Sequence, residues 1–348
     1  MQSCLAKFLP FIELPRFDSK KNRSHAMDMV IQILLLVLGF ALLVKGADWF
    51  VDGAAGIATK FGIPQLVIGL TIVAMGTSAP EAAVSITAAF AGNAEITIGN
   101  IVGSNVLNIL IILGITALVY PVAVQKSSLI FDIPVVLFAT AILFVLGYDG
   151  NISRLDGIIM LVVFVAYLFF LFWDAKRPKK LESVEVQQEE AENEETKNER
   201  KNLSLPKALI FTVIGLVLIV AGSNFVVKSA TFIATALGLS QRFIGLTIVA
   251  LGTSLPELFT SVTAAMKKNS DIAVGNIVGS NIFNILFIVG LSGLIIPVPF
   301  DPAFRFDTLV SGVAAILLLL CSLPKKRLSR IAGIFFLICY AVYFYMIW

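Results

Sequence analysis

Long apolar runs alternate with short polar connections along almost the whole chain. Ten of these runs approach the roughly 20 residues that an α-helix needs to cross the hydrocarbon core of a bilayer. Their approximate limits are 29–51, 64–90, 96–119, 129–147, 153–173, 205–228, 240–266, 271–296, 307–323 and 329–347. The pattern predicts an all-α integral membrane protein with ten transmembrane helices, for which the lipid bilayer is the first partner.

The composition supports this class. Hydrophobic residues make up 58% of the 348 residues and charged residues 14%, whereas about a quarter of a soluble domain is charged. A net charge of +3 is too small and too dispersed for a nucleic-acid-binding protein. Cys4, Cys321 and Cys339 are too scattered for a disulfide framework, and the single histidine, His25, lies outside every apolar run.

Polar stretches divide the chain. We expect a polar leader at 1–28, a first repeat with five spans at 29–173, an acidic linker at 174–204 and a second repeat with five spans at 205–348. The linker is too polar to fold alone, so it is interpreted as a solvated connection.

Lysine and arginine are more frequent in the loops opposite the two termini, which predicts a cytoplasmic linker and external termini in a cell membrane. The basic leader opposes this orientation unless translation begins at Met27.

The two halves repeat one another. Residues 46–121 align without a gap on 222–297, and about 40 of the 76 positions are identical. "IGLTIVAMGTSAPE" (68–81) corresponds to "IGLTIVALGTSLPE" (244–257), and "GNIVGSNVLNIL" (99–110) corresponds to "GNIVGSNIFNIL" (275–286). Because each unit has five spans, the second enters the membrane in the opposite sense. Such inverted repeats favour an alternating-access transporter, with the matching segments meeting near the bilayer midplane.

Glu81 and Glu257 occupy equivalent positions deep inside apolar spans. A carboxylate there costs about 2.5–3.5 kcal/mol or more to insert. Two such charges brought together by the repeat repel each other unless protons, two monovalent cations or one divalent cation offset them.

The residues before each glutamate predict a broken helix. Ser78 and Glu81 have the spacing of a capping box, and Pro80 interrupts the preceding hydrogen-bond ladder. We expect the carbonyl groups of 74–77 to lose their helical partners and to become oxygen ligands. The second copy repeats the pattern at Ala250, Thr253, Ser254 and Glu257.

The following span carries a polar stripe at Asn100, Ser104 and Asn108, repeated at Asn276, Ser280 and Asn284. We interpret Ser104, Asn108, Ser280 and Asn284 as ligands, and Asn100, Asn105, Asn276 and Asn281 more readily as helix-packing residues. The donors are all oxygen, which favours Na⁺, Ca²⁺ or Mn²⁺ over Zn²⁺ or Cu²⁺.

These doubled motifs, GTSAPE with GNIVGSNVLN and GTSLPE with GNIVGSNIFN, resemble the cation/calcium exchanger superfamily, in particular prokaryotic sodium/calcium exchangers. The resemblance implies exchange of three Na⁺ for one Ca²⁺, four midplane ion sites, and access that alternates as the first and sixth spans slide. It assigns Ca²⁺ to Glu81, Glu257, Thr77 and Thr253. Na⁺ would use these residues together with Ala74, Ala250, Ser78, Ser254, Ser104, Ser280, Asn108 and Asn284.

One position departs from the family, because Asn284 stands where many of these exchangers carry aspartate. K⁺ dependence is therefore not expected, the stoichiometry stays open, and Ca²⁺/H⁺ or another divalent cation/proton exchange is the alternative.

A channel or a membrane scaffold would explain the paired glutamates less well than an antiporter does. No nucleophile–base set and no GxxxxGK[ST] loop indicates an enzyme. We expect a monomer without a cofactor, whose ions are its substrates.

Overall fold

The computed structural model describes residues 19–175, 203–237 and 250–347. The helices of the first half are α1 (Ser19–Phe61), α2 (Gln65–Ile68), η2 (Gly69–Val73), α3 (Ala74–Thr77), α4 (Ala79–Phe90), α5 (Glu95–Leu107), η3 (Asn108–Leu113), α6 (Gly114–Val119), η4 (Ser128–Asp132), α7 (Ile133–Leu146), η5 (Gly147–Asp149) and α8 (Arg154–Ala175). Those of the second half are α11 (Leu205–Ala236), α13 (Ala250–Thr253), α14 (Leu255–Met266), α15 (Ser270–Ile282), η7 (Phe283–Val289), α16 (Gly290–Ile295), α17 (Ala303–Ser322) and α18 (Arg330–Ile347).

The predicted spans correspond to these helices. Within the described residues, eight helices are long and apolar enough to cross a membrane, and a bent pair formed by Gln65–Thr77 and Ala79–Phe90 makes a ninth. The predicted span 240–266 begins outside the described residues, and its described part is α13 with α14. Several predicted boundaries differ from the structure, since α1 ends at Phe61 and not near 51, and α11 ends at Ala236 and not near 228. α1 already begins at Ser19, within the expected leader, and α8 continues to Ala175, past the expected start of the linker.

The most buried helices lie at the centre of the bundle. The spans Ile96–Val119 and Ser270–Ile295 are far more enclosed by protein than the other described spans. They occupy equivalent places in the two halves, and both carry the predicted polar stripe. The helices around them expose apolar side chains such as Leu155, Phe169 and Ile331 outward, as expected for surfaces that face lipid.

Two short β-ribbons join the halves. β1 (Val122–Ala123) pairs antiparallel with β4 (Arg327–Leu328), and β2 (Asn151–Ile152) pairs antiparallel with β3 (Val298–Pro299). A shift of 176 positions carries the first strand of each ribbon onto a strand of the other, as an inverted repeat requires. Each half therefore contributes one strand to each ribbon.

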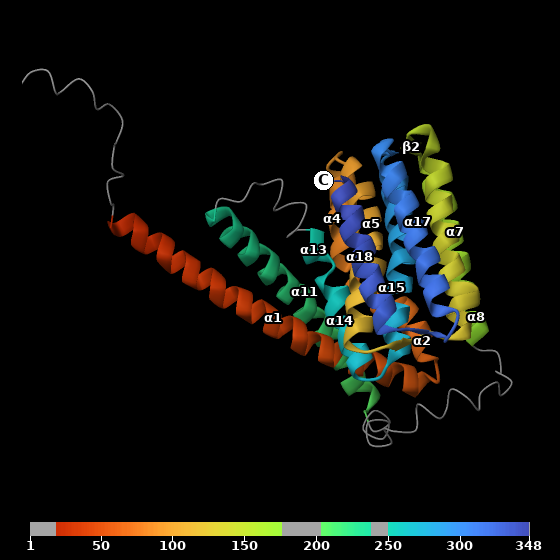
Figure 1. Cartoon of the computed structure of the whole chain (residues 1–348), viewed down its shortest axis with the longest axis horizontal. Coiled ribbons are helices and arrows are strands. Elements are labelled where there is room, and N and C mark those ends of the chain that lie inside the picture. Colours follow the sequence, from red (N-terminus) through yellow and green to blue (C-terminus); the bar gives the residue numbers. More distant parts are fainter. Residues whose placement is uncertain (1–18, 176–202, 238–249, 348) are drawn as a thin grey trace, which may run out of the picture.

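α1 and α11 form a separate antiparallel pair that leans away from the bundle (Figure 1). Glycines let their backbones approach closely, since a Cβ on Gly46 would lie 2.9 Å from the carbonyl oxygen of Gly215. Gly39 and Gly222, each seven residues away from Gly46 and Gly215 on its own helix, make the equivalent contact.

Candidate functional site

Two helix breaks face the centre of the bundle, one from each half. Ser78 separates α3 from α4, and the helical segments before and after it are bent by 51°, while Ser254 separates α13 from α14. Pro80 and Pro256 lie in the first turn of the helices that follow, where a missing N–H group breaks no bond of the new helix. The predicted breaks are confirmed at the predicted residues.

The serine at each break bonds to the glutamate of the other half. The Ser78 hydroxyl donates to Oε1 of Glu257 at 2.8 Å, and the Ser254 hydroxyl lies 3.4 Å from Oε1 of Glu81. Neither serine side chain caps its own helix, so the predicted capping role of Ser78 is wrong. A carboxylate is a stronger acceptor than a neutral group, and the repeat places one within reach.

Four buried oxygen atoms in this region accept no hydrogen bond from the described residues. They are Oε2 of Glu81, Oε2 of Glu257, Oδ1 of Asn108 and Oδ1 of Asn284. Both glutamates are only 1% exposed. A buried hydrogen-bond acceptor without a partner costs free energy, and oxygen atoms of this kind are the ligands that hard cations prefer. The residues present therefore suit Na⁺ or Ca²⁺ as a transported substrate.

The two amide oxygens are held by a network that crosses between the halves. The Asn108 amide donates to Oδ1 of Asn281 at 3.0 Å, and the Asn284 amide donates to Oδ1 of Asn105 at 3.0 Å. Asn105 and Asn281 in turn donate to each other's backbone carbonyl. Each donor bond leaves the acceptor end of Asn108 or Asn284 available. Both residues lie at π-helical segments, η3 and η7, and such segments are frequent at functional sites.

A second set of asparagines ties the stripe helices to the glutamate helices. Asn276 donates to the carbonyl of Glu257 at 3.3 Å and to the Ser261 hydroxyl at 2.9 Å. Asn100 makes the equivalent bonds to Glu81 and Ser85. These bonds position the two glutamates through their backbone, in agreement with the packing role expected for this pair.

The carbonyl of Ala74 differs from expectation. It accepts the N–H group of Ser78 at 3.0 Å, so it has not lost its helical partner, and the Ser280 hydroxyl lies 3.4 Å from it. The helix bends only after Ser78, which is why this bond survives. The Thr77 hydroxyl lies 3.3 Å from the same carbonyl and 2.9 Å from Oδ1 of Asn276.

The remaining predicted residues lie on the same segments. Ser104 is buried on α5 one turn before Asn108, and Ala250 and Thr253 lie in α13 immediately before the second break. Contacts between η3 and α14, and between η7 and α4, bring each amide segment against the opposite glutamate helix. All twelve predicted site residues thus belong to the two broken helices and the two stripe helices.

Sequence reasoning missed two features. Asn105 and Asn281 join the two halves, in agreement with the packing role expected for them, but they also accept the amides of Asn108 and Asn284, which was not expected. Their position three residues before Asn108 and Asn284, in both copies, was the available signal. Asp48 and Asp52 on α1 both pair with Lys267 at the end of α14, a contact between the halves that the sequence pattern does not indicate.

A helical membrane bundle made of two inverted halves around buried oxygen donors defines the class of secondary cation transporters. The chain belongs to the sodium/calcium exchanger protein family, which it matches over residues 31–173 and 207–348. It is 33% identical over 342 residues to the sodium/calcium exchanger MaX1 of Methanosarcina acetivorans, covering 90% of this chain and 98% of the relative. It is 36% identical over 308 residues to the inner membrane protein YrbG of Escherichia coli, covering 88% and 93%.

Solved structures agree with this assignment. The sodium-calcium exchanger NCX_Mj soaked without Na⁺ and Ca²⁺ matches with a TM-score of 0.78 and 31% identity, covering 92% of this chain and all of that one. The same exchanger soaked with 10 mM Na⁺ gives a TM-score of 0.77 at 32% identity, covering 90% and 98%. The ten-helix inverted-repeat fold and the membrane location are thereby confirmed, and the family is one of cation antiporters rather than enzymes.

Proposed function

We propose that the protein exchanges Na⁺ for Ca²⁺ by alternating access, with three Na⁺ moving against one Ca²⁺. The observation that carries the proposal is a set of four oxygen atoms, two carboxylate and two amide, that have no partner among the described residues and come equally from the two halves. Ca²⁺ takes six to eight oxygen ligands, and further oxygen atoms on the same segments would complete its shell, from the hydroxyls of Thr77, Thr253, Ser104 and Ser280 and the carbonyls of Ala74 and Ala250.

Charge balance favours competition between the two ions. Glu81 and Glu257 together carry two negative charges when ionised, which one Ca²⁺ or two Na⁺ neutralise. A third Na⁺ on the neutral oxygen donors would make the Na⁺-loaded carrier more positive than the Ca²⁺-loaded carrier by one charge. Each cycle would then move one net charge, worth about 2.3 kcal/mol per 100 mV.

The same carboxylates would prevent leak. Without a cation, two ionised glutamates would be buried close together in a region from which water is excluded, and this penalty opposes conformational change of the unloaded carrier. Exchange is then favoured over uniport, because each half-cycle needs an ion.

Proton coupling is the competing function. Two protons would neutralise the two glutamates as well as one Ca²⁺ does, and Asn284 supplies no third carboxylate. The proposed orientation, with the linker in the cytoplasm and both termini outside, and the proposed monomeric state apply to either coupling.

The test is ⁴⁵Ca²⁺ uptake into proteoliposomes loaded with Na⁺, with choline-loaded vesicles as control and a pH gradient as a third condition. We expect uptake that requires internal Na⁺ and changes with a clamped membrane potential. Uptake that ignores Na⁺ and follows the pH gradient would replace the proposal with Ca²⁺/H⁺ exchange. Uptake that needs neither counter-ion would reject exchange.

A further inference from the structure

The pair α1–α11 is held together more extensively than it is held to the rest of the bundle. The two helices pack against each other along most of their length, whereas their contacts with the rest of the bundle are much sparser. Close glycine contacts at Gly39, Gly46, Gly215 and Gly222 hold the pair together. The alternating access of the proposed function would then take place by displacement of this pair across the faces of the two glutamate helices.

The repeat relates these two helix faces to each other, but only one of them is covered by another helix. On α14, Phe259, Thr263 and Lys267 recur every four residues and so lie on one face. α1 covers this face, since the ring of Phe40 lies 6.2 Å from that of Phe259, and Lys267 reaches Asp48. Thr263, between these two contacts, is half-buried.

The corresponding residues of α4 are Ala83, Thr87 and Ala91, 176 positions earlier. All three line an open groove of about 490 Å³ and are exposed within the described part of the chain. One glutamate helix is therefore covered at its face and the other is open, as expected for one end state of an alternating-access cycle. Inversion of the repeat places the covered face and the open groove toward opposite sides of the membrane.

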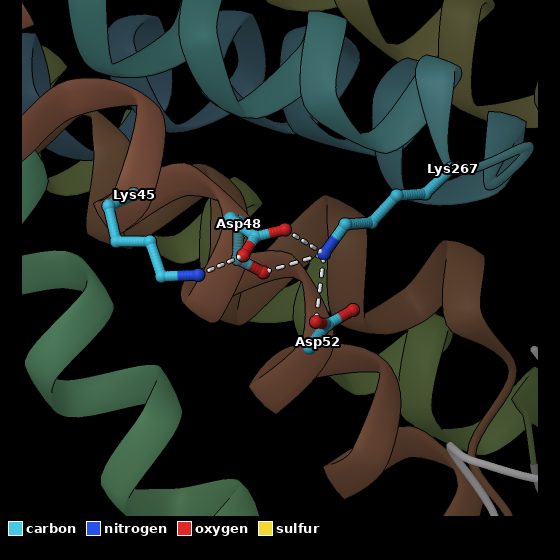
Figure 2. A network of polar contacts seen from close by, with 4 residues as sticks. All are labelled: Lys45, Asp48, Asp52 and Lys267. Carbon is cyan, nitrogen blue, oxygen red and sulfur yellow. Dashed lines mark hydrogen bonds and ion pairs between the residues drawn. The ribbon is translucent and has the colours of Figure 1, made fainter. Parts of the chain in front are cut away.

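A charged network fastens the covered face (Figure 2). The Lys267 ammonium lies between two carboxylates of α1, 2.6 Å from Oδ1 of Asp48 and 2.8 Å from Oδ2 of Asp52. It also donates to the backbone carbonyl of Asp48 at 2.9 Å. Lys45 pairs with the other oxygen of Asp48 at 2.8 Å. With the Lys267 side chain only 21% exposed, water screens these pairs less than it screens pairs at an open surface.

The other half has no counterpart to this network. The position equivalent to Lys267 is Ala91, and those equivalent to Asp48 and Asp52 are Asn224 and Lys228. If α11 moved over α4 as α1 now lies over α14, alanine would face asparagine and lysine. No ion pair of this type can form there, although the surrounding sequence is duplicated.

We propose that Lys267, Asp48 and Asp52 form a one-sided latch that stabilises the state in which α1 covers α14. None of these residues belongs to the proposed ion site, so they are positioning residues that set the balance between the two access states. The inference rests on the alternating access of the proposed function and adds a direction to it. Loss of the latch should shift the balance toward the opposite state about threefold to tenfold.

The test compares two symmetry-matched reporters in the purified full-length protein, in a background with its three cysteines replaced by alanine. Thr87→Cys reports the open face and Thr263→Cys reports the covered face. Maleimide labelling rates are measured in detergent without Na⁺ or Ca²⁺, so the readout does not depend on which ions are exchanged. Failure of ⁴⁵Ca²⁺ uptake in vesicles would reject the exchange function separately.

We expect Lys267→Met to raise the labelling rate at position 263 and to lower it at position 87, so that the ratio of the two rates changes about threefold to tenfold. Asp52→Asn, which removes one pair and keeps the lysine, should shift both rates in the same senses by less. Lys267→Arg should restore both rates. Lys60→Met, which removes a charge from the exposed end of α1, is the matched control and should change neither. Rates that rise together, or that do not change, would overturn the latch.

Discussion

Replacement of Glu257 by glutamine tests the core of the proposed site. In the structure Oε1 of Glu257 accepts the Ser78 hydroxyl, and Oε2 accepts nothing from the described residues. Glutamine keeps the shape of the side chain but exchanges one of these oxygens for an amino group. One orientation turns the amino group toward the cation, and the other turns it toward Ser78. The charge is lost in both.

The size of the effect follows from Coulomb's law. Two unit charges 4 Å apart interact by about 4 kcal/mol at an effective dielectric constant of 20. The lost carboxylate therefore removes about 4 kcal/mol of attraction for Na⁺ and about 8 kcal/mol for Ca²⁺. Since about 1.4 kcal/mol is tenfold, Ca²⁺ binding should fall by roughly three more orders of magnitude than Na⁺ binding at the same position.

The assay is Na⁺-dependent ⁴⁵Ca²⁺ uptake in proteoliposomes, with ²²Na⁺ binding to the purified protein as the second readout. Glu81→Gln should behave alike because it is the equivalent residue, and Asp174→Asn at the end of α8 is the control for loss of a carboxylate elsewhere. Near-normal Ca²⁺ uptake in either glutamine variant would refute the site. An equal loss of Na⁺ and Ca²⁺ affinity would refute the electrostatic reasoning while leaving the ligands in place.

Three further results are expected. Ser78→Ala should weaken Na⁺ activation of uptake more than Ser254→Ala, because the Ser78 hydroxyl makes the shorter bond to a carboxylate. Hydrogen bonds to charged groups contribute about 1.5–3 kcal/mol. Equal effects of the two substitutions would contradict this geometry. Asn276→Ala should lower the melting temperature in detergent by several degrees, since each buried partner left unpaired costs about 1–3 kcal/mol, and an unchanged melting temperature would show that these bonds contribute nothing. Gly46→Ala should destabilise or inactivate the protein, because the new Cβ would lie 2.8 Å from a backbone nitrogen of α11. Gly312→Ala is the control and should be tolerated in the same melting and uptake assays, because its Cβ would lie 3.7 Å from its nearest neighbour.

Much of the site could be predicted because its signals are local and doubled. Pro80 and Pro256 interrupt their helices whatever the surroundings, so the breaks followed from the sequence. Inversion of the repeat was enough to bring Glu81 and Glu257 to the same level of the membrane. The family and the ten-helix fold followed from the same doubled motifs and are confirmed.

The rest depends on contacts between residues far apart in the chain. Ser78 has the spacing of a helix cap, but the acceptor that its hydroxyl finds belongs to the other half. Asn105 and Asn281 look like packing residues on a single helix, and only their mutual contact gives them a role. Asp48 lies near the end of a span, where exposure of a charged side chain is the usual outcome. Nothing in its own helix indicates that it pairs with Lys267.

The amide network that joins the halves also constrains how the protein is made. Asn105 bonds to Asn281, 176 residues later, which at about 5–20 residues per second takes a ribosome roughly 10–35 s to reach. During that interval the first half lies in the membrane with Asn105, Asn108 and the Glu81 carboxylate still without the partners that the second half supplies. Insertion and assembly must therefore be separate stages. A chain that stops before Asn281 keeps a polar face exposed to lipid, which gives quality-control proteases a feature that the finished protein has buried.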